Sequence, residues 1–321
     1  MTNTPQKKQF IPPLKYPENY EYLLNLPREK YEWYLKLLFW TNRRMPLNLK
    51  NPKTLNEKLQ WLKLYNTDSF ITKLTDKIQV RNYVKQKIGK EYLKQIFQIC
   101  NRFEEINFER LPNSFYIKCN HGCKWQIFIK DKNALLSNSR AYVATKKLVN
   151  KWLTMKFFAV GGLELQYIGI QPKVFIEKVV EKKDEYLTEF EIYCFNGEPK
   201  INQKVLYTYP AKRSVWDEQF EISNIQFDST PNHNEIASEE IKKASKLSKI
   251  LAKDLKFVRI DWLYGKEGLF FNEMTFTPSS GFIMLTKETD KLLGSYLNLN
   301  TNEQDTISNE NEENEEKEDK E

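Results

Sequence analysis

The segment Phe257–Gly281, FVRIDWLYGKEGLFFNEMTFTPSSG, constrains the fold of this chain more than any other stretch. Two runs rich in aromatic and branched residues, Phe257–Tyr264 and Leu269–Thr277, flank the sequence Gly-Lys-Glu-Gly. Strand-forming runs on either side of a short glycine-containing turn are typical of an antiparallel β-hairpin. We therefore expect two neighbouring strands near the carboxyl end of the chain.

Four polar side chains are predicted to meet on one face of this hairpin. Because side chains alternate between the faces of a strand, Arg259 and Asp261 share a face, and so do Glu273 and Thr275 on the second strand. Two carboxylates beside an arginine suit a polyphosphate bound to Mg²⁺, which takes one or two protein carboxylates and completes its shell with phosphate and water oxygens. The alternative is a surface ion pair of little energetic consequence.

The charge of the chain is unevenly distributed. Its total formal charge is +7, but residues 301–321 contain eight Glu, two Asp and two Lys, a net charge of −8 that leaves +15 on the rest. The acidic end has almost no apolar residues and is predicted to be disordered. The basic remainder predicts anionic partners such as nucleotides, acidic sugars or a membrane surface. No nucleic-acid partner is expected, since no zinc spacing, RNP motif or helix-turn-helix signature is present.

No secretory or transmembrane segment is expected. The first residues lack the apolar run of a signal peptide, and the apolar segment Tyr34–Trp40 is too short to cross a bilayer. Four cysteines in a chain of 321 residues do not form a disulfide scaffold, which fits a cytoplasmic location. Cys119 and Cys123 bracket His121, but the only other histidine is His233, so a tetrahedral zinc site is not expected.

The first part of the chain is predicted to be mainly helical. Helical periodicity covers Arg28–Thr41, and Thr54 with Glu57 three residues on predicts a capping box at the start of a further helix. The next predicted helix, Asp68–Ile88, carries Asp76, Lys77 and Arg81 at one-turn spacing. These side chains form either a solvated ladder of ion pairs or a basic rim for an acidic substrate.

Strands and further helices are expected in the rest of the chain. Lys118 lies in a predicted apolar strand, Phe115–Cys119, where its ammonium either reaches water or is presented to an anion. A buried strand before a hinge is expected at 174–181, and Asn196-Gly197 predicts a hairpin turn whose return strand carries Lys204, in reach of phosphate. The other expected elements are a strand at Trp125–Lys130 and helices at Ser137–Phe158, Glu239–Asp254 and Leu285–Leu297.

Five motifs, taken in order, resemble the TupA-like branch of the ATP-grasp superfamily over residues 45–298. They are NPKTLNEKLQWLKLY (51–65), LTDKIQVRNYV (74–84), FYIKCNHG (115–122), YCFNGEPK (193–200) and NEMTFTPSSG (272–281). The last motif, with the preceding Arg-x-Asp, also resembles the closing motif of D-alanine–D-alanine ligases. The resemblance implies an α+β ATP-grasp fold, with two lobes that grip a nucleotide. The expected division is a helical N-terminal region (1–110), a small lobe (111–175), a large lobe with the Mg-ATP site (176–298) and a disordered acidic tail (299–321).

The resemblance also implies roles for individual residues. Metal ligands are expected at Asp261, Glu273 and Thr275, and catalytic residues at Arg259, Lys118 and Lys204. Nucleotide contacts are expected from Lys118, His121, Glu177, Val179, Val180, Glu189 and Lys204, with the two valines at the adenine hinge and Glu189 on the ribose. The chain departs from the pattern at Thr275, where ATP-grasp ligases have asparagine, at Cys123-Lys124, where the family has Ser-Gly, and at Glu191, where it has lysine.

The implied cofactors are ATP and Mg²⁺, and the implied reaction is ligation of a carboxylate, with a uronic acid as one candidate, to an amine through an acyl phosphate. The expected setting is cell-surface polysaccharide biosynthesis, with an acidic sugar or polysaccharide precursor as partner and peripheral association with membrane-bound machinery. One alternative is a glycosyltransferase of capsule or lipopolysaccharide assembly, although no D-x-D triplet is present. The other is a non-catalytic module that binds nucleotide.

Overall fold

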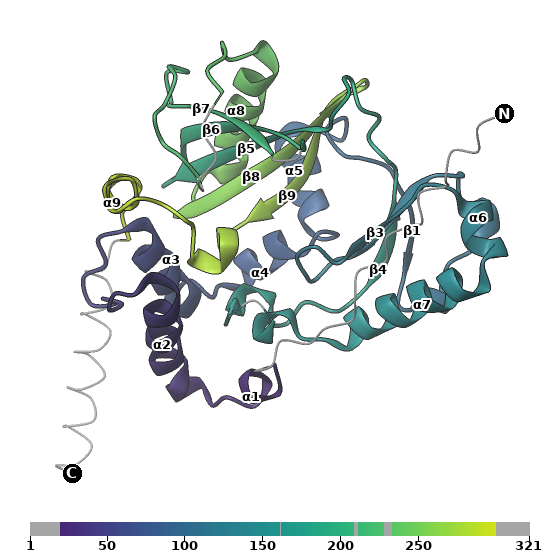
Figure 1. The fold of residues 1–321 in the computed structure, drawn as a ribbon, viewed down its shortest axis with the longest axis horizontal. Coiled ribbons are helices and arrows are strands. Elements are labelled where there is room, and N and C mark those ends of the chain that lie inside the picture. The colour runs from purple at the N-terminus through teal and green to yellow at the C-terminus, as the bar shows by residue number, and fades with distance from the viewer. Residues whose placement is uncertain (1–19, 161, 209–210, 228–232, 300–321) are drawn as a thin grey trace.

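Two antiparallel sheets and nine α-helices make up the described part of the chain, which comprises residues 20–160, 162–208, 211–227 and 233–299 of a computed structural model (Figure 1). The helices are α1 (Tyr20–Leu24), α2 (Tyr31–Arg43), α3 (Leu55–Tyr65), α4 (Ser69–Thr75), α5 (Val80–Ile88), α6 (Lys132–Ser137), α7 (Ser139–Thr154), α8 (Glu239–Ala252) and α9 (Lys287–Tyr296). The strands are β1 (Ile96–Cys100), β2 (Phe115–Cys119), β3 (Gln126–Ile129), β4 (Val174–Glu177), β5 (Thr188–Phe195), β6 (Glu198–Leu206), β7 (Lys212–Trp216), β8 (Phe257–Gly265) and β9 (Gly268–Thr275).

The N-terminal helices follow the predicted signals in part. Thr54 accepts a hydrogen bond from the N–H of Glu57, whose carboxylate accepts in return from the N–H of Thr54, so the predicted capping box is confirmed. The single helix predicted over 68–88 is wrong. It breaks at Asp76, whose buried carboxylate accepts from the N–H groups of Ile78 and Gln79 at 2.8 and 3.2 Å. The helix predicted over 137–158 is confirmed as α7, which begins at Ser139 and ends at Thr154, and the short helix α6 precedes it.

The smaller sheet has the strand order β1-β4-β2-β3. β2 and β3 form the predicted hairpin, and α7 packs against the sheet through side chains in the same hydrophobic core. β1 comes from the stretch that was expected to be helical, and it pairs with β4, whose last residue is Glu177. The division of the chain into a helical region and two lobes remains a proposal. In that division β1 would belong to the sheet of the small lobe.

The larger sheet has the order β7-β6-β5-β8-β9. Asn196 and Gly197 have φ angles of 48° and 84°, as a two-residue hairpin turn between β5 and β6 requires. The hairpin predicted from Phe257 onward is present, with Arg259 opposite Thr275 and Asp261 opposite Glu273. A β-bulge follows, because Trp262 pairs with Phe271 and leaves Asn272 as an extra residue.

Alternation along the central strands gives this sheet two different faces. Phe190, Ile192, Ile260 and Trp262 are buried together with the apolar side of α8, and the Trp262 indole N–H donates to Ser248 at 2.9 Å. The side chains at the positions between them point to the other face, toward the smaller sheet. Figure 1 shows α8 on one side of the larger sheet and the smaller sheet beyond the opposite side.

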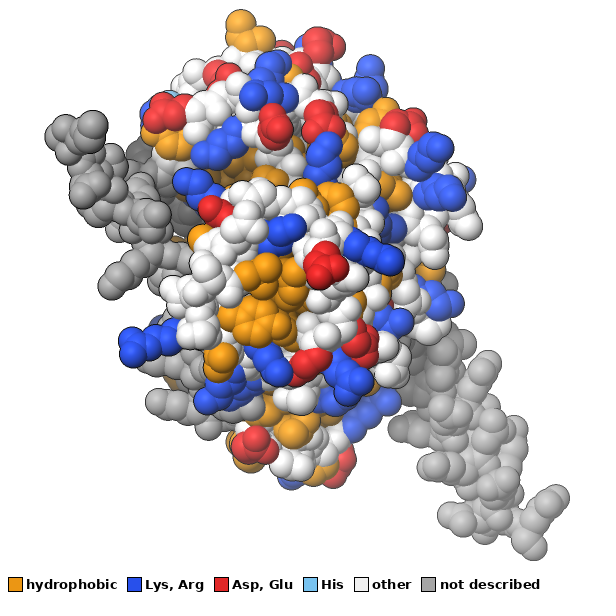
Figure 2. All heavy atoms as spheres, turned by 90° about the vertical axis from the view of Figure 1, so that its right-hand side faces the viewer, with side chains coloured by type: hydrophobic (Ala, Val, Ile, Leu, Met, Phe, Trp, Pro, Cys, Tyr) orange, Lys and Arg blue, Asp and Glu red, His pale blue; other side chains and the backbone are white. Residues whose placement is uncertain are grey.

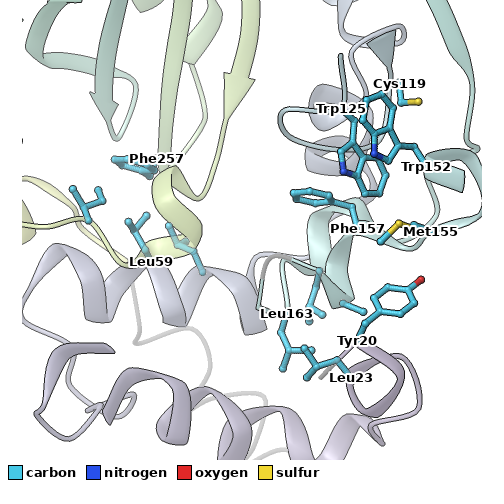
Figure 3. Close-up of a cluster of buried hydrophobic side chains, with 14 of the residues drawn as sticks. Tyr20, Leu23, Leu59, Cys119, Trp125, Trp152, Met155, Phe157, Leu163 and Phe257 are labelled. Carbon is cyan, nitrogen blue, oxygen red and sulfur yellow. The ribbon is translucent and has the colours of Figure 1, made fainter. Parts of the chain in front are cut away.

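One hydrophobic core joins the N-terminal helices to the smaller sheet and to one end of the larger sheet. Figure 3 shows Tyr20 and Leu23 below a column of rings from Trp125, Trp152 and Phe157. The two indoles stack with centroids 6.2 Å apart, and Phe157 meets Trp125 edge-on at 5.2 Å. No helix among the described residues combines the length and apolar character needed to span a membrane.

Candidate functional site

A cavity of about 600 Å³ is lined by residues of both sheets and of the α4–α5 region. Its lining includes an apolar set from four elements: Tyr116, Phe175, Val180, Leu187, Leu263 and Phe271. The remaining lining is strongly charged. The charged and amide side chains on its walls include Lys77, Arg81, Lys118, Glu177, Glu189, Glu191, Arg259, Asp261, Asn272 and Glu273. A ligand here would meet apolar surface and both signs of charge in one space.

Three cations at or beside the cavity surround Glu177, the last residue of β4. Its carboxylate lies 2.8 Å from the Lys118 ammonium, 3.0 Å from that of Lys94 and 3.7 Å from the Arg81 guanidinium. Burial would raise the pKa of Glu177, but Lys94 and Lys118 lower it to about 2. Burial also lowers the pKa of Lys94 to about 8, despite the attraction of Glu177. Three cations around one carboxylate leave an excess of positive charge, which suits an anion.

The acidic side of the cavity is built on β5 and β8. Arg259 donates to both oxygens of Asp261 at 2.7 Å, and its guanidinium lies 3.5 Å from Glu191 across the strands. Thr275 donates to the same Asp261 carboxylate at 3.3 Å. Asp261 is 1% exposed, and burial raises its pKa well above the ordinary value although Arg259 opposes the shift. The four-residue patch predicted from the hairpin is therefore assembled as the strand period required.

Glu273 is held by a lysine from outside the hairpin. The Lys77 ammonium lies 2.9 Å from the Glu273 carboxylate and donates to the carbonyl of Gly122 at 2.9 Å. Burial would raise the pKa of Glu273, but Lys77 lowers it to about 2. Lys77 belongs to the α4–α5 connection, so the break at Asp76 turns it into the cavity. Lys77 and Arg81 both line the cavity and pair with Glu273 and Glu177, so they do not form a solvated ladder of ion pairs along one helix.

A model of the TupA-like ATP-grasp family matches residues 57–298. The chain belongs to this family. The α+β ATP-grasp fold expected from the sequence is confirmed with it.

Solved structures with a similar fold are ligases and a synthetase. D-alanine–D-alanine ligase from Bacillus anthracis, complexed with ATP, is 14% identical with a TM-score of 0.38, over 63% of this chain and 53% of that one. The Helicobacter pylori D-alanine–D-alanine ligase is 14% identical with a TM-score of 0.39, over 76% and 69%. The ADP complex of PurK, an N5-carboxyaminoimidazole ribonucleotide synthetase, is 13% identical with a TM-score of 0.39, over 78% and 57%. This ATP-grasp chain thus spans about half the length of the first of them, and no curated protein matches it.

Four residues predicted for this ATP-grasp site do not line the described cavity: His121, Val179, Lys204 and Thr275. His121 is buried, and its ring nitrogens lie 3.2 Å from the Asn120 side-chain oxygen and 3.1 Å from the Trp152 carbonyl. Burial lowers the pKa of His121 to about 4, so the ring is a neutral part of the β2–β3 turn. Lys204 pairs with Phe190, on the face of the sheet that packs on α8, and its ammonium lies 3.0 Å from Glu235. The structure therefore brings neither side chain to the described cavity, and the geometry gives no support to their predicted contacts with phosphate.

An adenine hinge was predicted at Val179 and Val180. Val180 lines the described cavity, and Val179 does not. The hinge is fixed to the turn of the β8–β9 hairpin. Lys266 N–H donates to the Glu181 carbonyl at 2.9 Å, and a Cβ on Gly265 would lie 2.4 Å from that carbonyl oxygen. Only glycine allows this approach.

Some residues of the site carry no signal in the sequence. Asn272 faces the cavity because of the bulge, donates to Glu189 at 3.2 Å and accepts from Lys94 at 2.8 Å. Glu189 also accepts from the hydroxyl of Tyr207, and burial raises its pKa. Lys94 lies in a stretch without a motif, and a strict period of two places Asn272 on the wrong face.

The donor set fits one hard cation. Asp261 and Glu273 face each other across the hairpin, and each is already neutralised by one cation, Arg259 or Lys77. Among the described residues no group of three His, Cys, Asp or Glu side chains could hold a metal by itself. Mg²⁺ needs only one or two protein carboxylates when phosphate oxygens complete its shell. Thr275 is hydrogen-bonded to Asp261 and does not line the cavity, so it acts through that carboxylate.

Proposed function

We propose that this protein is an ATP-dependent ligase that joins a carboxylate to an amine through an acyl phosphate. The observation that supports this most is the combination, in one cavity, of an apolar set of side chains, a basic cluster around Glu177 and the paired carboxylates of the β8–β9 hairpin. The apolar set would suit a base, the basic cluster a chain of phosphates, and the carboxylates a metal that offsets the phosphate charge.

The nucleotide fits this cavity in one direction. Tyr116, Phe175 and Leu263 would enclose the adenine, with the backbone at Val179 and Val180 offering its hydrogen-bonding groups. Glu189 would accept from the ribose hydroxyls. Lys118, with Lys94 and Arg81 behind it, would neutralise the phosphates, because charge-assisted hydrogen bonds to phosphate are the strong ones.

Asp261 and Glu273 would hold Mg²⁺. When bound, the metal offsets the negative charge of the phosphates. Arg259, which is held by Asp261 and Glu191, would stabilise the charge of the transferring phosphoryl group. Catalysis of this kind rests on positioning and charge stabilisation, and no nucleophilic side chain is required.

The reaction balances without a further reactant. An oxygen of the acceptor carboxylate forms a bond to the γ-phosphorus of ATP while the bond to the β–γ bridging oxygen breaks, giving ADP and an acyl phosphate. The amine nitrogen then bonds to the acyl carbon, phosphate leaves with the C–O electron pair, and the amine loses a proton. We propose an acidic sugar or polysaccharide precursor as the carboxylate, in line with the basic charge of the protein.

Release of ADP in the presence of panels of amines and uronic acids tests the reaction, and trapping the acyl phosphate with hydroxylamine tests its intermediate. Glu273→Gln should abolish ADP release while the protein remains folded. Glu267→Gln, in the exposed turn of the same hairpin, should leave it unchanged. ADP release at the wild-type rate from Glu273→Gln would remove Glu273 from the site.

Thermal unfolding separates the alternatives. A ligand that binds only the folded state raises the melting temperature by mass action. The ligase proposal expects stabilisation by Mg-ATP. Stabilisation by UDP-sugars instead would favour a glycosyltransferase, and stabilisation by Mg-ATP without product from any acceptor would favour a nucleotide-binding module.

A further inference from the structure

An aromatic stripe lies on the outer side of α2. Trp33, Leu37 and Trp40 follow each other at helical spacing and are 53, 45 and 52% exposed. The inner side of the same helix, with Tyr34, Leu35 and Phe39, is buried in the core. The core therefore holds the helix in place and leaves a second apolar face outward.

The exposed apolar surface continues onto α1. Tyr22 and Leu24 are 50 and 37% exposed. The rings of Tyr22 and Trp33 both pack on Tyr34, with centroids 6.1 and 6.5 Å away, so the two helices present one continuous surface. We call Tyr22, Leu24, Trp33, Leu37 and Trp40 the aromatic face. Figure 1 shows α1 and α2 at the outer edge of the molecule, away from both sheets.

Basic residues surround this face. Residues 28–53 contain seven Lys or Arg and two Asp or Glu. At 100° per residue, Lys36 falls on the same side of α2 as the two tryptophans, while Lys30 and Arg44 flank the helix at its two ends, and all three are exposed. Glu32 and Lys36 are paired with each other at 2.5 Å and add no net charge, so six basic residues and Glu29 remain. The surroundings of the aromatic face therefore carry net positive charge.

We propose that the aromatic face docks on an anionic membrane surface, with α2 lying in the plane of the headgroups. An interfacial helix of this kind buries Trp and Leu at the boundary of the acyl chains, while Lys and Arg meet anionic headgroups. Tryptophan is enriched at that depth because its ring is apolar with one polar N–H. The proposal does not depend on the ligase reaction.

Other occupants fit the surface less well. A two-fold dimer through this face would place the same basic residues on both sides of the interface, and like charges across an interface are costly. Protein interfaces are depleted in lysine, which is present here. An apolar patch also lies at the centre of the face in Figure 2, but acidic and basic side chains are mixed around it, which offers no net attraction to an anionic surface.

Sedimentation of the full-length protein with vesicles tests the proposal. Vesicles of phosphatidylglycerol and phosphatidylcholine should bind the protein at least about ten-fold more strongly than phosphatidylcholine alone, and high salt should weaken binding because it screens the charges. The tryptophan emission should shift to shorter wavelength as the indoles leave water. Equal binding to both vesicle types, or none to either, would overturn the proposal.

Two variants locate the surface. Trp33→Gln with Trp40→Gln should reduce binding to the anionic vesicles at least about ten-fold, because it removes the buried apolar area. The control, Val143→Ser on α7 with Leu292→Ser on α9, changes two comparably exposed apolar residues and should bind like the wild type. Matching melting temperatures exclude unfolding as the cause. Loss of self-association instead of vesicle binding in the Trp variant would assign the face to a second copy and overturn the proposal.

Discussion

Lys118 and Lys204 show how strand alternation decides the role of a residue. Both lie on strands and both were predicted to meet phosphate. Lys118 lines the cavity beside Glu177, whereas Lys204 is on the face that packs on α8 and pairs with Glu235. A shift of one residue along a strand moves a side chain to the other face of a sheet.

The two lysines make a matched pair for a binding measurement. Lys118→Met should weaken Mg-ATP binding by at least about ten-fold, the cost of losing a charge-assisted hydrogen bond of about 1.5–3 kcal/mol. Lys204→Met should bind like the wild type. Isothermal titration calorimetry measures both. Equal losses in the two variants would place the phosphates elsewhere.

The lowered pKa of Glu177 is expected to make the free energy of unfolding decrease as the pH falls. Its pKa is about 2 in the folded protein against an ordinary 4.5, so its contribution is fully present above pH 4.5 and is lost as the pH falls toward 2. The shift corresponds to about 3 kcal/mol. Urea unfolding between pH 6 and pH 3 should show this loss. Glu177→Gln leaves three cations without their carboxylate, so this variant should be less stable than the wild type at pH 6. Its free energy of unfolding should also change less between pH 6 and pH 3. An unchanged slope in that variant would assign the acid dependence to other groups.

At the scale of elements, locally determined features were predictable and long-range ones were not. The hairpin turns at Asn196-Gly197 and Gly265–Gly268 were predictable because they contain residues that favour tight turns. The helix break depends on the buried carboxylate of Asp76, and the pairing of β1 depends on β4, more than seventy residues away. The bulge at Asn272 is invisible to a strict period of two. This is why the hairpin patch was predicted correctly while Lys94 and Asn272 were missed.

The contact between the β8–β9 turn and the hinge can be tested at Gly265. Gly265→Ala should destabilise the fold by about 1–3 kcal/mol, since its methyl group meets the Glu181 carbonyl and one of the two must move. Because the hinge moves with it, Mg-ATP binding should weaken as well. Lys266→Ala, at the next position in the exposed turn, is the control for both measurements. Wild-type stability of the Gly265→Ala protein would show that the backbone at Glu181 can move away from the added methyl group without an energetic cost.

At the scale of the whole molecule, Lys77 connects three parts of the chain. It lies between α4 and α5, donates to Gly122 in the β2–β3 turn of the smaller sheet, and pairs with Glu273 on β9 of the larger one. The N-terminal helices therefore supply a cation to a site between the two sheets. Since that cation neutralises a proposed metal ligand, Lys77 and Mg²⁺ compete for the same carboxylate.

Replacing Lys77 should change the melting temperature and the magnesium requirement in predictable directions. Without magnesium, Lys77→Met should melt at a lower temperature than the wild type, because Glu273 is left as a buried carboxylate without its cation. With magnesium and ATP the difference should shrink, and the Mg²⁺ concentration for half-maximal stabilisation should fall several-fold. Lys124→Met, at another lysine that lines the cavity, is the control and should change neither value. A magnesium requirement that stays the same or rises in Lys77→Met would mean that Glu273 does not hold the metal, and the charge that Lys77 balances would then be structural.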